Sequence, residues 1–177
     1  LIVALDYSSA EEALALVDKL GPDIEWYKVG KQLFTLEGPS IVRALKAKGK
    51  KVFLDLKFHD IPNTVAQAVS SALTVGAEMV NFHASGGSEM MKTTVALNKG
   101  KSPDSLLIAV TVLTSMGQET LDEIAVDGTP AEAVLRLASL TKESGVDGVV
   151  CSAWEIDAIK EKCGRDFKVV VPGIRPK

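Results

Sequence analysis

The sequence predicts an α/β protein built as a (β/α)8 TIM barrel, with strand eight missing from the printed chain. Two observations lead to this fold class. Short apolar runs alternate with longer helical patterns about seven times, which predicts a parallel sheet with right-handed crossovers. Polar residues also recur where successive predicted strands end, and in a barrel those ends converge on one mouth.

The predicted strands are runs rich in Val, Ile and Leu that lack strict alternation, a pattern that suits strands covered on both faces. In chain order they span residues 1–5, 26–29, 51–56, 79–83, 106–113, 148–152 and 168–171. No linker interrupts them, so we expect a single domain over residues 1–177. The chain stops soon after the seventh run, which would leave two exposed strand edges, and we therefore expect a truncated C-terminus.

Helical patterns fill the intervals between the predicted strands. Ser8 and Glu11 have the spacing of a capping box, and Gly21, followed by Pro22, is expected to end the first helix. Three further segments place apolar residues three or four apart and then reach a glycine, which predicts amphipathic helices. These segments span residues 41–49, 65–76 and 134–145.

An open doubly wound sheet competes with the barrel as an arrangement of these elements. An open sheet would gather its functional residues at one switch point, whereas a barrel brings the ends of all strands together. The spread of polar residues over many strand ends favours the barrel. These residues are Asp6, Lys28, Asp55, Lys57, His83, Thr114, Ser152 and Arg175.

Composition and spacing argue against several functions. The formal net charge of −3 implies no basic surface for nucleic acid, and no apolar run approaches the about 20 residues of a membrane helix. Cys151 and Cys163 are expected to be reduced thiols of a cytoplasmic protein. His59 and His83 lack zinc-ligand spacing, and His83 is interpreted as a hydrogen-bonded residue of the barrel mouth.

The most informative motif is D-x-K-x-x-D, formed by Asp55, Lys57 and Asp60 at the end of the third predicted strand. Residues two apart in a strand point to the same side, so Asp55 and Lys57 are expected to project together. Their apolar neighbours indicate buried surroundings, where a charge pair is costly unless it is well satisfied. From these residues alone the pair is either a structural ion pair or a group that performs chemistry.

Five segments together resemble the orotidine 5′-phosphate decarboxylase family, in order and at plausible spacing through the whole chain. They are Ala4-Leu5-Asp6, Tyr27-Lys28-Val29-Gly30, Asp55-Leu56-Lys57-Phe58-His59-Asp60-Ile61-Pro62-Asn63-Thr64, Val112-Leu113-Thr114 and Val171-Pro172-Gly173-Ile174-Arg175-Pro176. The third segment is the most specific. The resemblance implies a barrel that works as a homodimer without cofactor or metal and converts orotidine monophosphate to uridine monophosphate.

Two alternatives are considered beside this resemblance. Magnesium-dependent sugar-phosphate decarboxylases and aldolases of the same superfamily also carry D-x-K-x-x-D, but with an acidic residue at the second strand end. Here that position is Lys28, and Mg²⁺ prefers oxygen ligands, so the sequence favours the metal-free enzyme. A non-catalytic phosphosugar-binding barrel is the second alternative, and its function would survive the loss of Lys57.

The resemblance also implies roles for the residues of the D-x-K-x-x-D segment. Decarboxylation leaves electrons at C6 of the pyrimidine, so the reaction needs fixed positive charge and then a proton, and Lys57 can supply both. Asp55 is expected to hold Lys57. Asp60, with Thr64 and Ile61, is expected to reach the neighbouring active site across a dimer interface.

The remaining expected contacts are with the nucleotide substrate. Asp6 and Lys28 match residues that bind the ribose hydroxyls, and Thr114 matches a residue that binds the pyrimidine. Arg175 matches a residue of the family's phosphate-binding site, and the preceding Pro172-Gly173 pair suits a tight phosphate-binding loop. The family's later glutamine and final Gly-Arg pair, which complete that phosphate-binding site, are not in the printed sequence.

Overall fold

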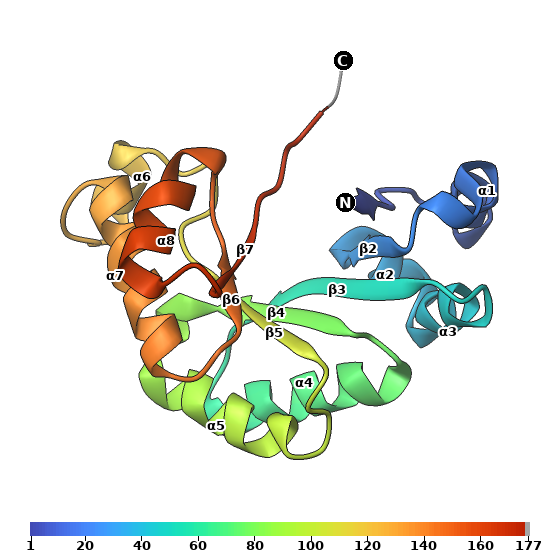
Figure 1. Cartoon of the computed structure of the whole chain (residues 1–177), viewed down its shortest axis with the longest axis horizontal. Helices are drawn as coiled ribbons and strands as arrows, with labels where there is room; N and C mark the ends of the chain where they lie inside the picture. The colour runs from blue at the N-terminus through green and yellow to red at the C-terminus, as the bar shows by residue number, and fades with distance from the viewer. Residues whose placement is uncertain (176–177) are drawn as a thin grey trace.

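Seven parallel strands form one sheet whose spatial order is the order of the chain. The computed structural model describes residues 1–175, and in it the sheet curls into a partial barrel (Figure 1). Sequential order with helical crossovers is the topology of a (β/α) barrel, so the predicted fold class is confirmed. The strands are β1 (Ile2–Ala4), β2 (Trp26–Gly30), β3 (Lys51–Phe58), β4 (Met79–His83), β5 (Leu106–Val110), β6 (Gly148–Val150) and β7 (Lys168–Val170).

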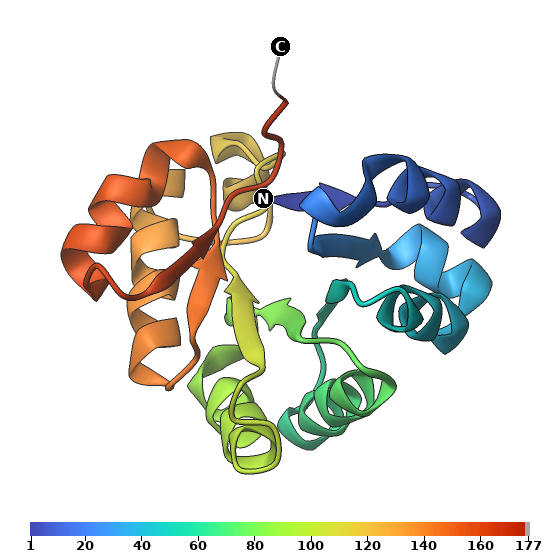
Figure 2. The same ribbon diagram turned by 45° about the vertical axis from the view of Figure 1, so that its right-hand side comes forward.

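The helices form a layer around the outside of the strands (Figure 2). They are α1 (Ala10–Leu20), α2 (Lys31–Glu37), α3 (Pro39–Ala47), α4 (Pro62–Val75), α5 (Gly87–Lys99), α6 (Gln118–Glu123), α7 (Pro130–Glu143) and α8 (Ile156–Cys163). Three short 3-10 helices accompany them, namely η1 (Gly21–Asp23), η2 (Ala84–Gly86) and η3 (Ala153–Glu155). Helices α2, α3, α4 and α7 pack on the outer face of the strands, and the inner face of the sheet lines the barrel interior.

The main core lies between the sheet and the helices that follow its strands. Ile41 and Leu45 of α3 are buried against the same cluster as Val65 and Val69 of α4, as their helical spacing predicts. Burying each such side chain stabilises the fold by about 1.5–3 kcal/mol. This apolar layer fixes the strands, and the strands in turn fix the residues at their carboxyl ends.

Some sequence-based boundaries were wrong at the ends of elements. The fifth strand ends at Val110 and the sixth at Val150, because the chain leaves the sheet there for the loops that build the barrel mouth. Ser9, rather than Ser8, caps α1 by accepting a hydrogen bond from the Glu12 amide at 3.3 Å. The predicted glycine stop at Gly21 is confirmed.

Helix α5 was not predicted because its buried face is partly polar. Met90 and Met91 are buried together with Thr94 and Asn98, so the apolar period is interrupted. Thr94 donates to the Met90 carbonyl at 2.8 Å, and Asn98 donates to the carbonyls of Thr94 and Ala66 at 2.8 and 3.1 Å. These hydrogen bonds satisfy the buried polar groups, and only the folded chain reveals them.

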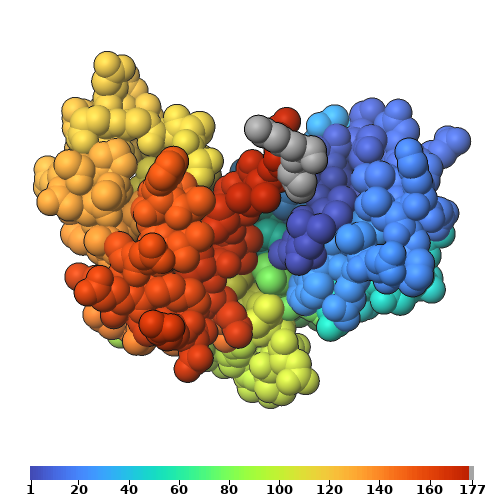
Figure 3. Space-filling view, turned by 45° about the horizontal axis from the view of Figure 1, so that its top comes forward, coloured from blue at the N-terminus to red at the C-terminus, as the bar shows by residue number. Residues whose placement is uncertain are grey.

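The two halves of the chain lie on opposite sides of the molecule (Figure 3). Within residues 1–175, β1 and β7 are the edges of the sheet and do not pair with each other. The chain after β7 runs away from the sheet as an extended segment (Figure 1).

None of the helices described here has the length and apolarity to cross a membrane.

At the amino-terminal end of the sheet, a carboxylate ties two neighbouring strands together. Asp147 directly precedes β6, accepts a hydrogen bond from the Leu107 amide of β5 at 2.7 Å, and forms an ion pair with Lys99 of α5 at 2.8 Å. Lys99 also donates to the Ser105 carbonyl at 2.6 Å. This carboxylate therefore joins strand to strand and sheet to helix.

The same arrangement recurs two strands earlier. Glu78 directly precedes β4, accepts a hydrogen bond from the Val52 amide of β3 at 2.8 Å, and forms an ion pair with Lys46 of α3. The repetition at equivalent positions indicates a structural device of the βα unit.

Candidate active site

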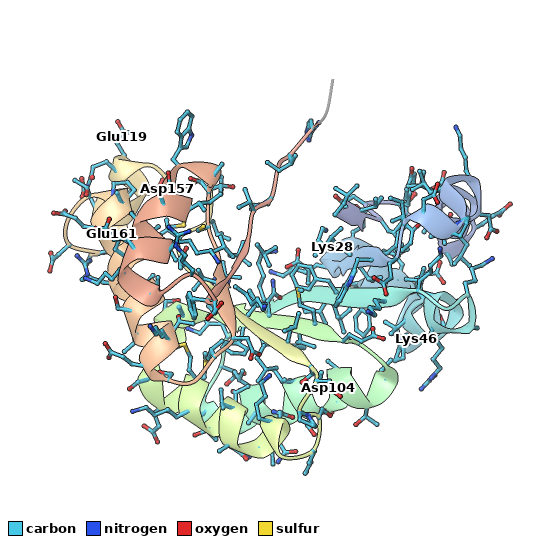
Figure 4. All side chains as sticks on the ribbon, in the orientation of Figure 1. Lys28, Lys46, Asp104, Glu119, Asp157 and Glu161 are labelled. Atoms are coloured by element: carbon cyan, nitrogen blue, oxygen red, sulfur yellow. The ribbon has the colours of Figure 1, made fainter. Side chains whose placement is uncertain are left out.

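A chain of alternating charges crosses the carboxyl-terminal ends of the first three strands. The Asp6 carboxylate, two residues after β1, lies 3.0 Å from the Lys28 ammonium of β2. Lys28 lies 3.6 Å from Asp55 Oδ2 of β3, and Asp55 Oδ1 accepts a hydrogen bond from Lys57 Nζ at 2.6 Å. The structure thus brings together four of the predicted site residues. Lys28 projects from the inner side of the sheet, whereas Lys46 lies on the outer, helical side (Figure 4).

Burial is greatest at Asp55, in the middle of this chain of charges. The Asp6 side chain is 68% exposed, whereas those of Lys28, Lys57 and Asp55 are 23%, 26% and 12% exposed. The Lys57 ammonium is therefore held by a nearly buried carboxylate but is still accessible from the barrel mouth. A substrate at the mouth could reach it.

Strand β3 is irregular where Asp55 and Lys57 lie, which corrects the expectation of simple strand alternation. Leu54 pairs with Val80 and Phe58 pairs with Phe82, so four residue steps in β3 oppose two in β4. Lys57 has a φ of +53°, in the left-handed region that side-chain-bearing residues rarely adopt. The two charged side chains meet because of this irregularity as well as their spacing.

Asn81 of β4, which the sequence analysis did not single out, lies opposite this irregularity. Its side chain is almost wholly buried, donates to Asp55 Oδ1 at 2.6 Å and accepts from the Lys57 amide at 2.8 Å. The available signal was an asparagine in the middle of an otherwise apolar strand, because such a buried amide needs partners.

The surroundings keep Asp55 ionised. Burial by itself raises the pKa of Asp55, but hydrogen bonds from Lys57 and Asn81 and the charges of Lys57 and Lys28 outweigh it. The pKa of Asp55 consequently lies below its usual value, and the carboxylate is negative at neutral pH. The nearly buried Asp55 carboxylate and the two ammonium groups beside it create a strong local electric field at the barrel mouth.

His83 ends β4 at the barrel mouth, as expected, and its ring centroid lies 5.5 Å from that of His59. Burial and the nearby charges of His59, Lys31 and Lys57 lower the pKa of His83, so this ring is neutral at pH 7. No side-chain hydrogen bond of His83 occurs within the described part of the chain, so the expected hydrogen-bonded role is not supported.

The turn after β3 and the first turn of α4 carry three further predicted site residues, all of them exposed. Asp60 accepts a hydrogen bond from the amide of Ile61 at 2.7 Å, and Ile61 is 68% exposed. Thr64 lies on the first turn of α4 and also faces solvent. In residues 1–175 Asp60 pairs with no lysine, so the structure does not place it in the charge chain.

Thr114 lines a separate cavity of about 470 Å³ where the loops after β5, β6 and β7 meet. Pro172, Gly173 and Ile174 line the same cavity, so two of the predicted substrate segments come together there. Arg175, the next residue, is exposed in the extended segment after β7 and makes no side-chain hydrogen bond with the described residues. Pro176, the last residue of the resembling segment, lies outside the described residues.

Both cysteines are free and buried, in agreement with the expectation of unpaired thiols. Burial, with the charge of Glu155, raises the pKa of Cys151 to about 12, and burial also raises the pKa of Cys163. A thiol with a raised pKa is a poor nucleophile at neutral pH. The cysteines therefore have no part in the candidate site.

Comparisons with known proteins agree with this architecture. The family model described as "Orotidine 5'-phosphate decarboxylase / HUMPS family" matches residues 1–177. A protein of Pasteurella multocida named orotidine 5′-phosphate decarboxylase is 52% identical over 177 residues, covering 99% of this chain and 76% of the relative. A protein of the same name from Pectobacterium atrosepticum is 54% identical over 177 residues, covering 99% of this chain and 72% of the relative.

Solved structures show the same fold. An uncharacterized conserved protein from Geobacillus kaustophilus superposes with a TM-score of 0.91 at 44% identity, covering 97% of this chain and 82% of that one. Orotidine 5′-phosphate decarboxylase from Lactobacillus acidophilus superposes with a TM-score of 0.90 at 40% identity, covering 99% of this chain and 81% of that one. With the whole-length family match, these likenesses establish that the chain belongs to the orotidine 5′-phosphate decarboxylase / HUMPS family.

Proposed function

We propose that this protein decarboxylates orotidine 5′-monophosphate to uridine 5′-monophosphate, a step of pyrimidine synthesis. The observation that carries the proposal is the alternating chain Asp6, Lys28, Asp55 and Lys57 at the carboxyl ends of three adjacent strands. Barrel enzymes place their active sites at these ends. The names of the relatives from Pasteurella multocida and Pectobacterium atrosepticum support the same reaction.

Lys57 is the proton donor in this proposal. The bond between C6 and the carboxylate carbon breaks, carbon dioxide leaves, and the electron pair stays at C6 in the plane of the ring. The Lys57 ammonium stabilises that developing charge and then transfers one proton to C6, which gives the product. The lysine regains its proton from solvent through the open mouth, to which its side chain is partly exposed.

Asp55 positions the donor, because its Oδ1 accepts the hydrogen bond from Lys57 Nζ at 2.6 Å. It is ionised at neutral pH, since its pKa lies below the usual value. The Asp55 charge would also repel the substrate carboxylate before carbon dioxide leaves, which destabilises the bound ground state.

The remaining contacts would orient the nucleotide. Asp6 and Lys28 are proposed to bind the ribose hydroxyls, since they form the end of the charge chain that lies away from Lys57, and Asp6 is largely exposed there. Thr114 is proposed to bind the pyrimidine from the cavity that it shares with the loop after β7. Arg175 is proposed to contact the phosphate, as its place in that loop suggests.

A magnesium-dependent reaction on a sugar phosphate is the alternative, and the residues do not fit a magnesium site. The Lys28 ammonium lies between the carboxylates of Asp6 and Asp55, where a metal ion would need oxygen ligands. No group of three His, Cys, Asp or Glu side chains in residues 1–175 is arranged to hold a metal ion. We therefore favour the metal-independent decarboxylation.

The test is turnover of orotidine monophosphate by the purified full-length protein, followed as loss of substrate absorbance and by identification of uridine monophosphate. We expect turnover without added metal and an unchanged rate after treatment with a chelator. A strict requirement for magnesium, with no turnover of orotidine monophosphate, would transfer the assignment to the sugar-phosphate reaction. Binding of the nucleotide without any turnover would favour the non-catalytic barrel.

We further propose a homodimer whose active sites are shared. Asp60, Ile61 and Thr64 lie exposed at the start of α4, outside the charge chain of their own subunit. An Asp60 from a second subunit would extend the alternation beyond Lys57 and offset its charge, which would complete the array.

Mixing two inactive variants tests the shared site. A heterodimer of Asp60→Ala and Lys57→Ala subunits contains one site with both defects and one native site. We expect the mixture to regain activity, up to about half of the sites in each heterodimer. Heterodimers that form, as native mass spectrometry would show, but have no activity would place Asp60 in the site of its own subunit.

A further inference from the structure

We propose that Asn81 is the positioning residue that holds Lys57 in its left-handed backbone conformation and Asp55 in register with it. This inference rests on the proposed decarboxylation and adds a residue to it. Asn81 touches no substrate in this proposal. It acts through Asp55 and Lys57, which it contacts with the two ends of one side-chain amide.

The backbone of Lys57 needs such support. A residue with a side chain in the left-handed region costs about 1–2 kcal/mol, and such conformations persist only where their surroundings hold them. In residues 1–175, only Lys57 and Ala125 adopt a positive φ without being glycine. Ala125 follows a helix, whereas Lys57 lies inside a strand. The Lys57 conformation therefore requires a specific explanation.

The contacts of Asn81 supply that explanation. Register slips between Leu54 and Phe58, so the Lys57 amide cannot make a regular ladder hydrogen bond there. The amide donates instead to Asn81 Oδ1 at 2.8 Å. Asn81 is buried, so no water competes for this hydrogen bond.

The other end of the same amide fixes the carboxylate. Asn81 Nδ2 donates to Asp55 Oδ1 at 2.6 Å, the oxygen that also accepts from Lys57 Nζ. A side chain that donates to a carboxylate and accepts from an amide must carry both functions at this length, and asparagine does. Leucine has neither function, and an ionised aspartate has only the acceptor.

The test compares Asn81→Leu with Asn98→Leu. Asn98 is equally buried and donates two hydrogen bonds to carbonyls, but it lies in α5 away from the charge chain. We expect Asn81→Leu to lower kcat by about 100-fold with KM changed less than about threefold, because only the reacting groups are misplaced. Asn98→Leu should lower stability but leave the kcat of folded enzyme within about twofold. Equal kcat values for the two folded variants would overturn the inference.

Asn81→Asp supplies a second test that a merely structural role would not pass. A protonated aspartic acid can donate to Asp55 and still accept from the Lys57 amide, whereas the ionised form cannot donate. Asp55 and Lys57 contact this side chain directly, and Lys28 contacts Asp55. His83 lies two residues further along β4, and its ring is next to that of His59. We expect its kcat relative to the parent to be highest at acid pH and to fall as pH rises. A ratio independent of pH would overturn the inference even if Asn81→Leu failed to fold.

Hydrogen exchange separates this inference from the proposed reaction. We expect the Lys57 amide to exchange roughly tenfold faster in Asn81→Leu, since it loses its acceptor. The Val52 amide of the same strand, which Glu78 holds, should be unchanged. If the parent protein does not turn over orotidine monophosphate, the proposed reaction is refuted. If the Lys57 amide exchanges at the same rate in Asn81→Leu as in the parent, the proposed role of Asn81 is refuted.

Discussion

At the amino-terminal end of the sheet Asp147 lies 2.8 Å from Lys99, and at the carboxyl-terminal end Asp55 lies 2.6 Å from Lys57. The partners of the two carboxylates differ. Asp147 accepts a main-chain hydrogen bond from Leu107, whereas the described partners of Asp55 are all side chains. An Asp–Lys ion pair thus occurs at both ends of the sheet. At the amino-terminal end its carboxylate also binds the main chain, whereas at the carboxyl-terminal end its carboxylate binds only side chains.

The different partners of the two carboxylates indicate which end of the sheet carries the chemistry. A nearly buried charge array is costly to assemble, and it contributes little net stability compared with apolar packing. The ion pairs of the array at the carboxyl-terminal end cross from strand to strand through side chains only, so we explain the retention of the array by function. We expect substitutions at the carboxyl-terminal end to affect mainly activity and substitutions at the amino-terminal end to affect mainly stability. Three experiments test this expectation.

The largest expected effect is on turnover, from Lys57→Ala. This change removes the positive charge at C6 and the acid, and general acid catalysis alone contributes about 100- to 10,000-fold. We therefore expect kcat to fall at least about a thousandfold, while the far-UV circular dichroism and the binding of uridine monophosphate are largely retained. A folded variant that binds nucleotide and turns over within tenfold of the parent would contradict the role of Lys57.

The next largest effect is on stability, from Asp147→Ala at the opposite end. Loss of the carboxylate leaves the Leu107 amide without its acceptor and should cost about 1–3 kcal/mol, or about 2–4 °C in Tm for each kcal/mol. Lys99→Met is the matched control, because it keeps the acceptor and should cost about 1 kcal/mol or less. Thermal unfolding gives the stability of each variant, and kcat is measured in parallel. A large loss of kcat in folded Asp147→Ala would contradict the expectation that the amino-terminal end serves mainly stability.

The smallest effect is a change in the pH dependence of stability, from Asp55→Asn. Since the pKa of Asp55 is lowered in the folded protein, its ionised form contributes stability above the unfolded pKa of about 3.9. That contribution is lost as pH falls through the folded pKa. The difference in unfolding free energy between parent and variant should therefore be constant near pH 6 and move against the parent below about pH 4. Denaturant titrations across this range measure it, and a difference independent of pH would contradict the pKa shift.

The sequence predicted the alternation of strands and helices because the apolar period of each element is a local property. The predicted strands all occur, and the predicted helices that contain Ile41, Val65 and Val134 are confirmed. Helix α5 was missed because Thr94 and Asn98 occupy its buried face, where hydrogen bonds to backbone carbonyls replace apolar packing. Its existence depends on contacts that no local pattern shows.

For the candidate site, the charged residues and the strand ends that they follow could be predicted from the sequence. Asp6, Lys28, Asp55 and Lys57 were predicted and lie together, because parallel strands bring their carboxyl ends to one edge. The proposed roles of Asp60, Ile61, Thr64, Thr114 and Arg175 stay predictions.

The contacts that hold Asp55 and Lys57 in place depend on the folded structure. Spacing predicted that Asp55 and Lys57 would share a face, but not that the strand would slip in register or that Lys57 would adopt a φ of +53°. Asn81, 24 residues after Lys57, provides the hydrogen bonds that make this geometry possible. A local sequence window contains the charges but not the distant buried amide that positions them, because that contact exists only once β3 and β4 are paired.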